Sequence, residues 1–120
     1  MKILLVEDNE MNRDMLVRRL SNAGYIVESA TNGKAALEQM TLNRPDVVLM
    51  DMNLPIMDGW TACREAKKDS LLKTIPILAL TAHAMEIDRQ LALDSGCVDY
   101  ATKPIDFPAL LNKIQKASEE

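Results

Sequence analysis

The fold of this chain follows from one stretch, residues 46–55, which reads Asp46-Val47-Val48-Leu49-Met50-Asp51-Met52-Asn53-Leu54-Pro55. Four apolar residues run without alternation and end on the carboxylate of Asp51. A short, continuous apolar run of this kind is typical of a strand that is buried on both faces, as in a parallel sheet. Ligands bind outside the carboxyl ends of the strands in open parallel sheets. The stretch therefore predicts that Asp51 lies at a ligand-binding edge, and the alternative is that Asp51 only caps a loop.

Composition and charge indicate an ordinary domain with an acidic balance. The chain has 120 residues, of which 48% are hydrophobic and 27% are charged, and its formal net charge is −4. It has no basic cluster, so we expect no direct nucleic-acid binding. The longest apolar runs have the length of a strand, and the run after Met1 is too short for a signal peptide. We therefore expect a cytoplasmic protein with no membrane insertion.

The two cysteines, Cys63 and Cys97, have no neighbours in the sequence that would complete a metal site. We interpret them as small apolar packing residues in a reducing cytosol. A disulfide between them is the less favoured alternative.

Apolar runs alternate with amphipathic segments along the whole chain. Asn9, Asn32 and Asp58 are suited to cap three helices. Met11, Met15, Leu16 and Leu20 are expected to form the apolar stripe of the first helix. The predicted strands are 2–6, 25–29, 46–50, 76–80 and 98–102, and the predicted helices run from about 10 to 23, 33 to 42, 58 to 68, 85 to 94 and from 106 onward. The chain stops with its last helix, so we expect a single domain over residues 1–120 with no output domain.

Five strands that alternate with five helices predict an α/β fold, a parallel sheet with helices on both faces. The commoner doubly wound order for five strands is 2-1-3-4-5, the flavodoxin-like (βα)5 arrangement, which reverses between strands one and three. Glu7, Asp8 and Asp51 flank that reversal. The fourth strand brings Thr81 to the same edge, and the fifth brings Lys103. Polar side chains from four strand ends are therefore expected to converge.

This set of side chains matches the needs of phosphoryl transfer. Three carboxylates at close range call for a cation, and ligation by a few carboxylate oxygens suits Mg²⁺. A carboxylate beside such an ion can attack phosphorus and form an aspartyl phosphate. The ammonium of Lys103 and the hydroxyl of Thr81 could then neutralise phosphoryl oxygens. Each residue also has a plainer interpretation: Glu7-Asp8 and Thr81 as caps, and Lys103 as a solvated charge.

The residues Glu7-Asp8, Asp51, Thr81 and Lys103-Pro104 resemble the signature of response-regulator receiver domains of two-component signalling, and the resemblance covers essentially the whole chain. It implies that Asp51 is the phosphoacceptor. It also implies a Mg²⁺ site formed by Asp8 directly, Glu7 through water, the carboxylate of Asp51 and the backbone carbonyl of Asn53. The remaining implied roles are phosphate binding by Thr81, Ala82 and Lys103, a switch pair of Thr81 and Tyr100, and two residues beside the site, His83 and Pro104, the latter after a peptide bond that is often cis.

The resemblance implies a phosphoacceptor switch and not an enzyme, although the switch assists its own phosphorylation and dephosphorylation. The expected partners are a sensor histidine kinase or phosphotransfer protein and a downstream protein target. A stand-alone regulator is favoured over a receiver excised from a hybrid kinase. Two other functions stay open. One is a phosphohydrolase of the haloacid dehalogenase type, which would want a second Asp where Asn53 stands, and the other is a scaffold that is never phosphorylated.

Overall fold

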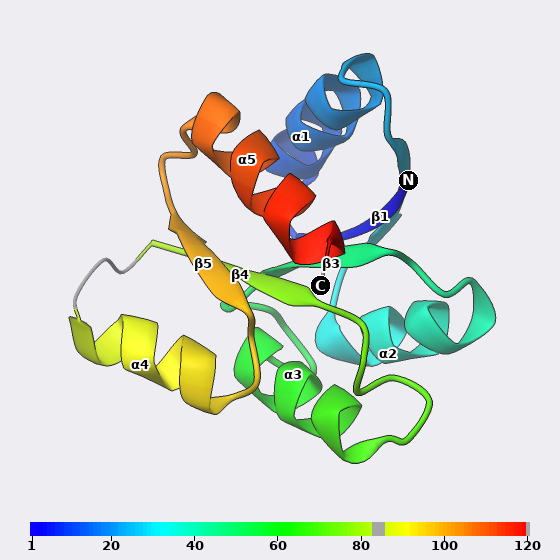
Figure 1. Cartoon of the computed structure of the whole chain (residues 1–120), viewed down its shortest axis with the longest axis vertical. Coiled ribbons are helices and arrows are strands. Elements are labelled where there is room, and N and C mark those ends of the chain that lie inside the picture. Colours follow the sequence, from blue (N-terminus) through cyan, green and yellow to red (C-terminus); the bar gives the residue numbers. More distant parts are fainter. Residues whose placement is uncertain (83–85, 120) are drawn as a thin grey trace.

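The computed structural model describes residues 1–82 and 86–119 and places them in a three-layer α/β arrangement (Figure 1). Strands and helices alternate along the chain. The elements are β1 Lys2–Val6, α1 Glu10–Asn22, β2 Ile26–Ala30, α2 Gly33–Leu42, β3 Val47–Asp51, α3 Gly59–Lys68, β4 Ile77–Thr81, α4 Glu86–Asp94, β5 Asp99–Thr102 and α5 Phe107–Ser118.

The five strands form one parallel sheet in the order β2-β1-β3-β4-β5, which confirms the predicted doubly wound fold. Three strands begin and end one residue later than predicted: β2, β3 and β4. Their last residues are Ala30, Asp51 and Thr81. Backbone pairing explains the shift, because the N–H of Met52 still donates to the carbonyl of Leu80 at 3.1 Å. A strand predicted from an apolar run ends at the first polar side chain. The ladder of backbone hydrogen bonds can continue beyond that residue.

Helices cover both faces of the sheet, with α1 and α5 on one side and α2, α3 and α4 on the other (Figure 1). Alternate residues of each strand therefore enter different cores. Leu49 packs in the core beneath α1 and α5, whereas Val48 and Met50 pack in the core beneath α2 and α3. All five residues of β3 are buried, as expected for a strand with helices on both faces.

Side-chain caps begin the helices at the predicted positions. Asn9 accepts the backbone N–H of Asn12 at 3.0 Å, and Asn32 accepts that of Ala35 at 2.8 Å. Asp58 makes the same bond to Thr61 at 2.7 Å. Each cap satisfies a backbone donor that a helix leaves unpaired and contributes about 1 kcal/mol. None of the helices in the described part of the chain is long and apolar enough to cross a membrane.

The predicted stripe of α1 is only half right. Leu16 and Leu20 are buried, but Met11 is 82% exposed and Met15 is 43% exposed. Met15 precedes Leu16 by one residue, which turns it about 100° around the helix and away from the sheet. Two methionines are thereby left on the surface of α1.

Candidate functional site

The carboxyl edge of the sheet brings the predicted residues together. Glu7 follows β1, Asp51 and Thr81 end β3 and β4, and Lys103 follows β5. The register aligns the ends, because Asp51 pairs with Leu80 on β4. Beyond the last paired residues, the N–H of Lys103 donates to the carbonyl of Thr81 at 2.8 Å. One edge of a continuous sheet thus carries all four side chains.

Lys103 joins the two buried carboxylates of this edge. Its Nζ lies 3.0 Å from Oδ2 of Asp51 and 3.4 Å from Oε1 of Glu7. Asp51 is 4% exposed, and its Oδ1 accepts the backbone N–H of Asn53 at 3.0 Å. Burial works to lower the pKa of Lys103, but the hydrogen bonds and charges of Asp51 and Glu7 outweigh it and raise that pKa. Lys103 therefore stays an ammonium and neutralises part of the acidic charge.

Glu7 is the most strongly perturbed carboxylate of the site. It is 2% exposed, and its pKa is raised to about 7, chiefly by burial and in addition by the hydrogen bond and charge of Asp51. Lys103 lowers the pKa of Glu7, but not enough to offset these effects. The Oε2 atom of Glu7 is buried without a hydrogen-bond partner among the described residues. Such an atom is costly unless a ligand satisfies it.

The acidic residues fit a divalent cation. Glu7, Asp8 and Asp51 each offer one oxygen, and these oxygens lie within 4.8 Å of one another. A cation among them would lower their mutual repulsion and could satisfy the orphaned Oε2 of Glu7. A set of oxygen ligands with one exposed member, Asp8, leaves room for the waters that Mg²⁺ retains. Asn53 is exposed beside the set, with its N–H bound to Asp51.

The residues predicted to bind phosphate and to switch lie on β4 and β5 and in the segments that follow these strands. Thr81 is 2% exposed, and Ala82 next to it is exposed. Tyr100 is half-buried on β5, with Nζ of Lys113 5.3 Å from the centre of its ring. The peptide bond between Lys103 and Pro104 is cis. His83 lies outside the described residues.

The loop that follows Asp51 contains features that the sequence interpretation missed. Ile56 has a φ of 66°, and the N–H of Met57 donates to the carbonyl of Pro55 at 2.7 Å, which makes a tight γ-turn. A Cβ on Gly59 would clash with the carbonyl oxygen of Asp51. The sequence predicts the cap at Asp58 but not this close approach, for which the glycine directly after the cap is the available signal.

A second missed residue is Arg13 on α1. Its Nη1 donates to the carbonyl of Glu7 at 3.1 Å and, at 3.5 Å, to the carbonyl of Asp8. Arg13 thereby holds the backbone that carries both acidic side chains. Arg13 comes four residues after Asn9, within one turn of the helix start, so its side chain can reach back to the backbone before the helix. This spacing is the sequence signal that could have identified Arg13.

The family model of the response regulator receiver domain matches residues 3–115. The chain therefore belongs to the response regulator receiver family, and it is a receiver domain of the two-component type. It is similar to the polar-differentiation response regulator DivK of Brucella anthropi, with 35% identity over 113 residues that cover 94% of this chain and 92% of DivK. The chain spans about a quarter to a half of the length of several other curated relatives.

Solved receiver domains have the same fold. The receiver domain of the sensor histidine kinase PA1611 from Pseudomonas aeruginosa superposes with a TM-score of 0.91 at 36% identity, covering 99% of this chain and 98% of that one, and it holds a magnesium ion in its active-site cleft. The receiver domain of Ssk1 from Saccharomyces cerevisiae, crystallised with the histidine phosphotransfer protein Ypd1, matches with a TM-score of 0.91 at 30% identity, covering 98% of this chain and 88% of that one.

Proposed function

We propose that Asp51 accepts a phosphoryl group from a phosphohistidine and that this modification switches a protein-binding face. The observation that carries the proposal is the bridge of Lys103 between Asp51 and Glu7, beside a third carboxylate, at the carboxyl edge of the sheet. A nucleophilic carboxylate, a fixed ammonium and a cation site are the parts that phosphoryl transfer requires.

The side chains divide the work of the transfer. A carboxylate oxygen of Asp51 attacks phosphorus, a new O–P bond forms, and the N–P bond of the donor histidine breaks. The ammonium of Lys103, already 3.0 Å from Asp51, neutralises one phosphoryl oxygen. The hydroxyl of Thr81 and the backbone N–H of Ala82 donate to the others. Burial of Asp51 strengthens these interactions because water is limited there.

Glu7, Asp8 and Asp51, with the backbone carbonyl of Asn53, would hold Mg²⁺. The ion supplies positive charge that stabilises the transferring phosphoryl group. The oxygens of the three carboxylates support this assignment through their mutual distances of at most 4.8 Å. The magnesium ion of the PA1611 receiver supports it as well.

The phosphohistidine donor is proposed to dock beside α1. A hollow of about 360 Å³ lies next to the site between α1 and the segment after β5, and Glu7 and Lys103 form part of its wall. Leu16, Met15 and Ile105 give it an apolar surface. Exposed Met11 extends the apolar area on the same helix. The complex of Ypd1 with the Ssk1 receiver supports a phosphotransfer protein as the donor.

Phosphorylation is proposed to draw Thr81 toward the phosphoryl group and to let Tyr100 move into the space that it leaves. The face formed by α4, β5 and α5 then changes, and a downstream protein binds it. This is a two-state equilibrium biased by a local charge.

The domain acts as a switch that assists its own phosphorylation and dephosphorylation. Its proposed location is cytoplasmic, which the two free cysteines support. The comparisons favour neither the phosphohydrolase nor the scaffold.

Labelling with acetyl phosphate and Mg²⁺, followed by intact mass measurement, tests the proposal. The wild-type protein should gain one phosphoryl group and Asp51→Asn none, because an amide is not a nucleophilic carboxylate. Asp58→Asn is the matched control, since it makes the same change at a helix cap outside the acidic set and should label normally. Labelling of Asp51→Asn at the wild-type rate would remove Asp51 from its role.

A further inference from the structure

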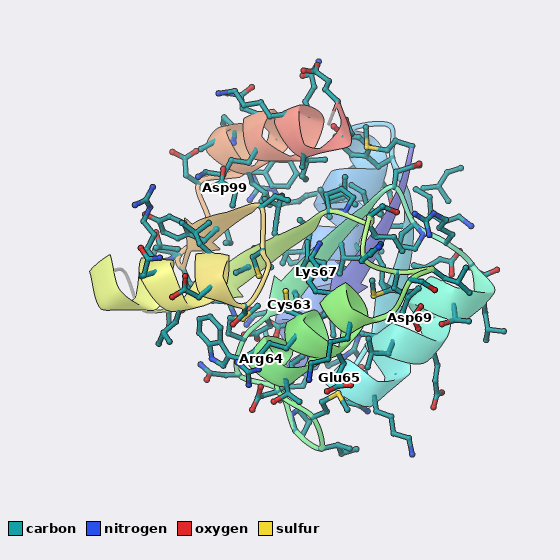
Figure 2. All side chains as sticks on the ribbon, turned by 60° about the horizontal axis from the view of Figure 1, so that its bottom comes forward. Cys63, Arg64, Glu65, Lys67, Asp69 and Asp99 are labelled. Carbon is teal, nitrogen blue, oxygen red and sulfur yellow. The ribbon has the colours of Figure 1, made fainter. Side chains whose placement is uncertain are left out.

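A pair of cysteines lies on the face of the sheet covered by α2, α3 and α4. Cys63 belongs to α3, and Cys97 lies between α4 and β5. Their Sγ atoms are 3.3 Å apart although the residues are separated by 34 positions, and both cysteines are free. Figure 2 shows Cys63 and Lys67 on the side of α3 toward the sheet, with Glu65 on the outer side. The phosphoryl-transfer chemistry proposed above makes no use of this pair.

The geometry is that of two thiols nearly close enough to bond. A disulfide brings two sulfurs to about 2.05 Å. To form this bond, the two sulfurs would have to come closer by roughly 1.2 Å, and rotation of the two cysteine side chains is the proposed source of that movement. Cys63 lies in the middle of α3, whereas Cys97 lies in the junction between α4 and β5 and follows Gly96, whose φ is 101°. The bond would therefore form between two sulfurs that are already in contact.

The surroundings shift the pKa values of the two thiols in opposite directions. The hydrogen bond between the two thiols lowers the pKa of Cys63; burial opposes this, and the charges of Lys67 and Arg64 add to the lowering. The same hydrogen bond and burial raise the pKa of Cys97. Cys63 is therefore the nucleophile of the pair, and Cys97 is the proton donor.

Lys67 lies next to the pair. Its Nζ donates to the carbonyl oxygens of Lys73 at 3.1 Å and Ile75 at 3.3 Å. Its aliphatic stem lies directly over Gly96, where a Cβ would clash with it. Cys97 beneath is 5% exposed and Cys63 is fully buried. A flexible side chain thus lies beside the buried pair.

We propose that Cys63 and Cys97 form a reversible disulfide when the protein meets a peroxide, and that this bond fastens the junction of α4 and β5 to α3. The site lies before β5, whereas Lys103 follows that strand, so the cross-link is at the edge of the sheet away from Asp51. It should leave phosphoryl chemistry intact.

The steps balance with hydrogen peroxide as the oxidant. The thiolate of Cys63 attacks one peroxide oxygen, the O–O bond breaks, and hydroxide leaves and takes the proton of Cys97 to become water. Cys63 is now a neutral sulfenic acid, so the negative charge that kept the proton on Cys97 has gone. The Cys97 thiolate attacks the Cys63 sulfur, the S–O bond breaks, and hydroxide leaves and takes a proton from solvent. Two thiols and one peroxide give one disulfide and two waters.

The test exposes the folded protein to hydrogen peroxide, quenches it, and alkylates free thiols after denaturation. Peptide mapping should then find Cys63 and Cys97 linked to each other, with both thiols recovered after dithiothreitol. Met11, which is 82% exposed, is the internal measure of exposure to peroxide because it forms a sulfoxide. Sulfoxide at Met11 with both cysteines still alkylated would overturn the proposal.

A thermal melt gives a second readout. Closing a loop of this length should raise the melting temperature of the oxidised wild type by roughly 10 °C over the reduced form. Cys63→Ala and Cys97→Ala should each show no shift on oxidation, measured against their own reduced forms. An equal shift in either variant, or none in cross-linked wild type, would contradict the fastening of α3 to the α4–β5 junction. Acetyl phosphate labelling of the oxidised protein should match that of the reduced protein.

Discussion

Leu49 and Asp51 lie two residues apart on β3 and are both buried, but their surroundings are opposite. Leu49 is fully buried among apolar side chains beneath α1 and α5. Asp51 is 4% exposed among charged groups, with Lys103 on one oxygen and Glu7 close by. One strand therefore carries apolar packing in its body and part of a charged cluster at its end. Truncating the side chain of Leu49 should therefore lower the stability of the fold, whereas replacing Asp51 should lower it little or not at all.

The largest effect is expected in the body of the strand. Leu49→Ala should lower the free energy of unfolding by about 3–5 kcal/mol, because it removes buried apolar surface and leaves a cavity. Chemical denaturation measures the change. Leu42→Ala is the control, since that side chain is 76% exposed, and its effect should stay within about 0.5 kcal/mol. A cost for Leu49→Ala as small as that of the control would break the comparison.

The next effect is a dependence on pH at the end of the neighbouring strand. Glu7 has a pKa of about 7 in the folded protein, against an ordinary value of 4.5. Between these values the folded state binds more protons than the unfolded state, so stability falls as the pH rises toward and through 7. Glu7→Gln does not titrate, so its stability relative to the wild type should grow between pH 5 and pH 8, by on the order of 3 kcal/mol at most.

Melting temperatures of both proteins in EDTA, at several pH values, measure this difference. EDTA is needed because a bound divalent cation would favour the ionised form of Glu7. A constant difference between Glu7→Gln and the wild type over that range would show that Glu7 is ionised in the fold at all these pH values.

A smaller effect is expected at Asp51 itself. Asp51→Asn loses an ion pair with Lys103 but also removes the charge that repels Glu7, which can then ionise and pair with the same ammonium. The balance should raise the melting temperature of the metal-free protein at neutral pH by about 2–5 °C. Adding Mg²⁺ should erase the advantage, because the wild type gains more from the cation. Asp58→Asn, which changes a helix cap, should not melt higher than the wild type.

The smallest effect concerns the loop beyond the strand. Ile56 is 82% exposed with a φ of 66°, a conformation that disfavours a β-branched residue. Ile56→Gly should therefore raise the free energy of unfolding by about 0.5 kcal/mol, since relief of strain exceeds the added freedom of the unfolded chain. Ile26→Gly, at an exposed strand position, should instead lower it by about 1 kcal/mol. Equal losses in the two variants would show that Ile56 carries no strain.

Local patterns predicted the part of this structure that depends on local physics. The apolar run before Asp51 gave the central strand, and Asn9, Asn32 and Asp58 gave three helix starts, because burial on both faces and capping are visible in short windows. The convergence of the site residues followed from the strand order alone. The roles of those residues stay predictions.

Other features depend on packing between distant segments and left no local signal. Glu7 and Asp8 are adjacent acids, yet one is buried and the other exposed, because only Glu7 points under the edge of the sheet toward Lys103. The contact of Cys63 with Cys97 joins positions 34 residues apart. Met11 fits an apolar pattern but turns outward on α1. In each case the direction in which a side chain points determines its burial and its contacts, and a short sequence pattern does not indicate that direction.

The contact of Gly59 with the backbone of Asp51 has a consequence for engineering the domain. The N–H of Gly59 donates to the carbonyl of Met52 at 3.2 Å, so the two ends of the loop between β3 and α3 meet. Such a loop can be lengthened outward at its exposed tip, near Pro55, without changing the distance between its ends. Gly59→Ala would push those ends apart and move α3 away from β3. The glycine, more than the length of the loop, fixes where the helix begins.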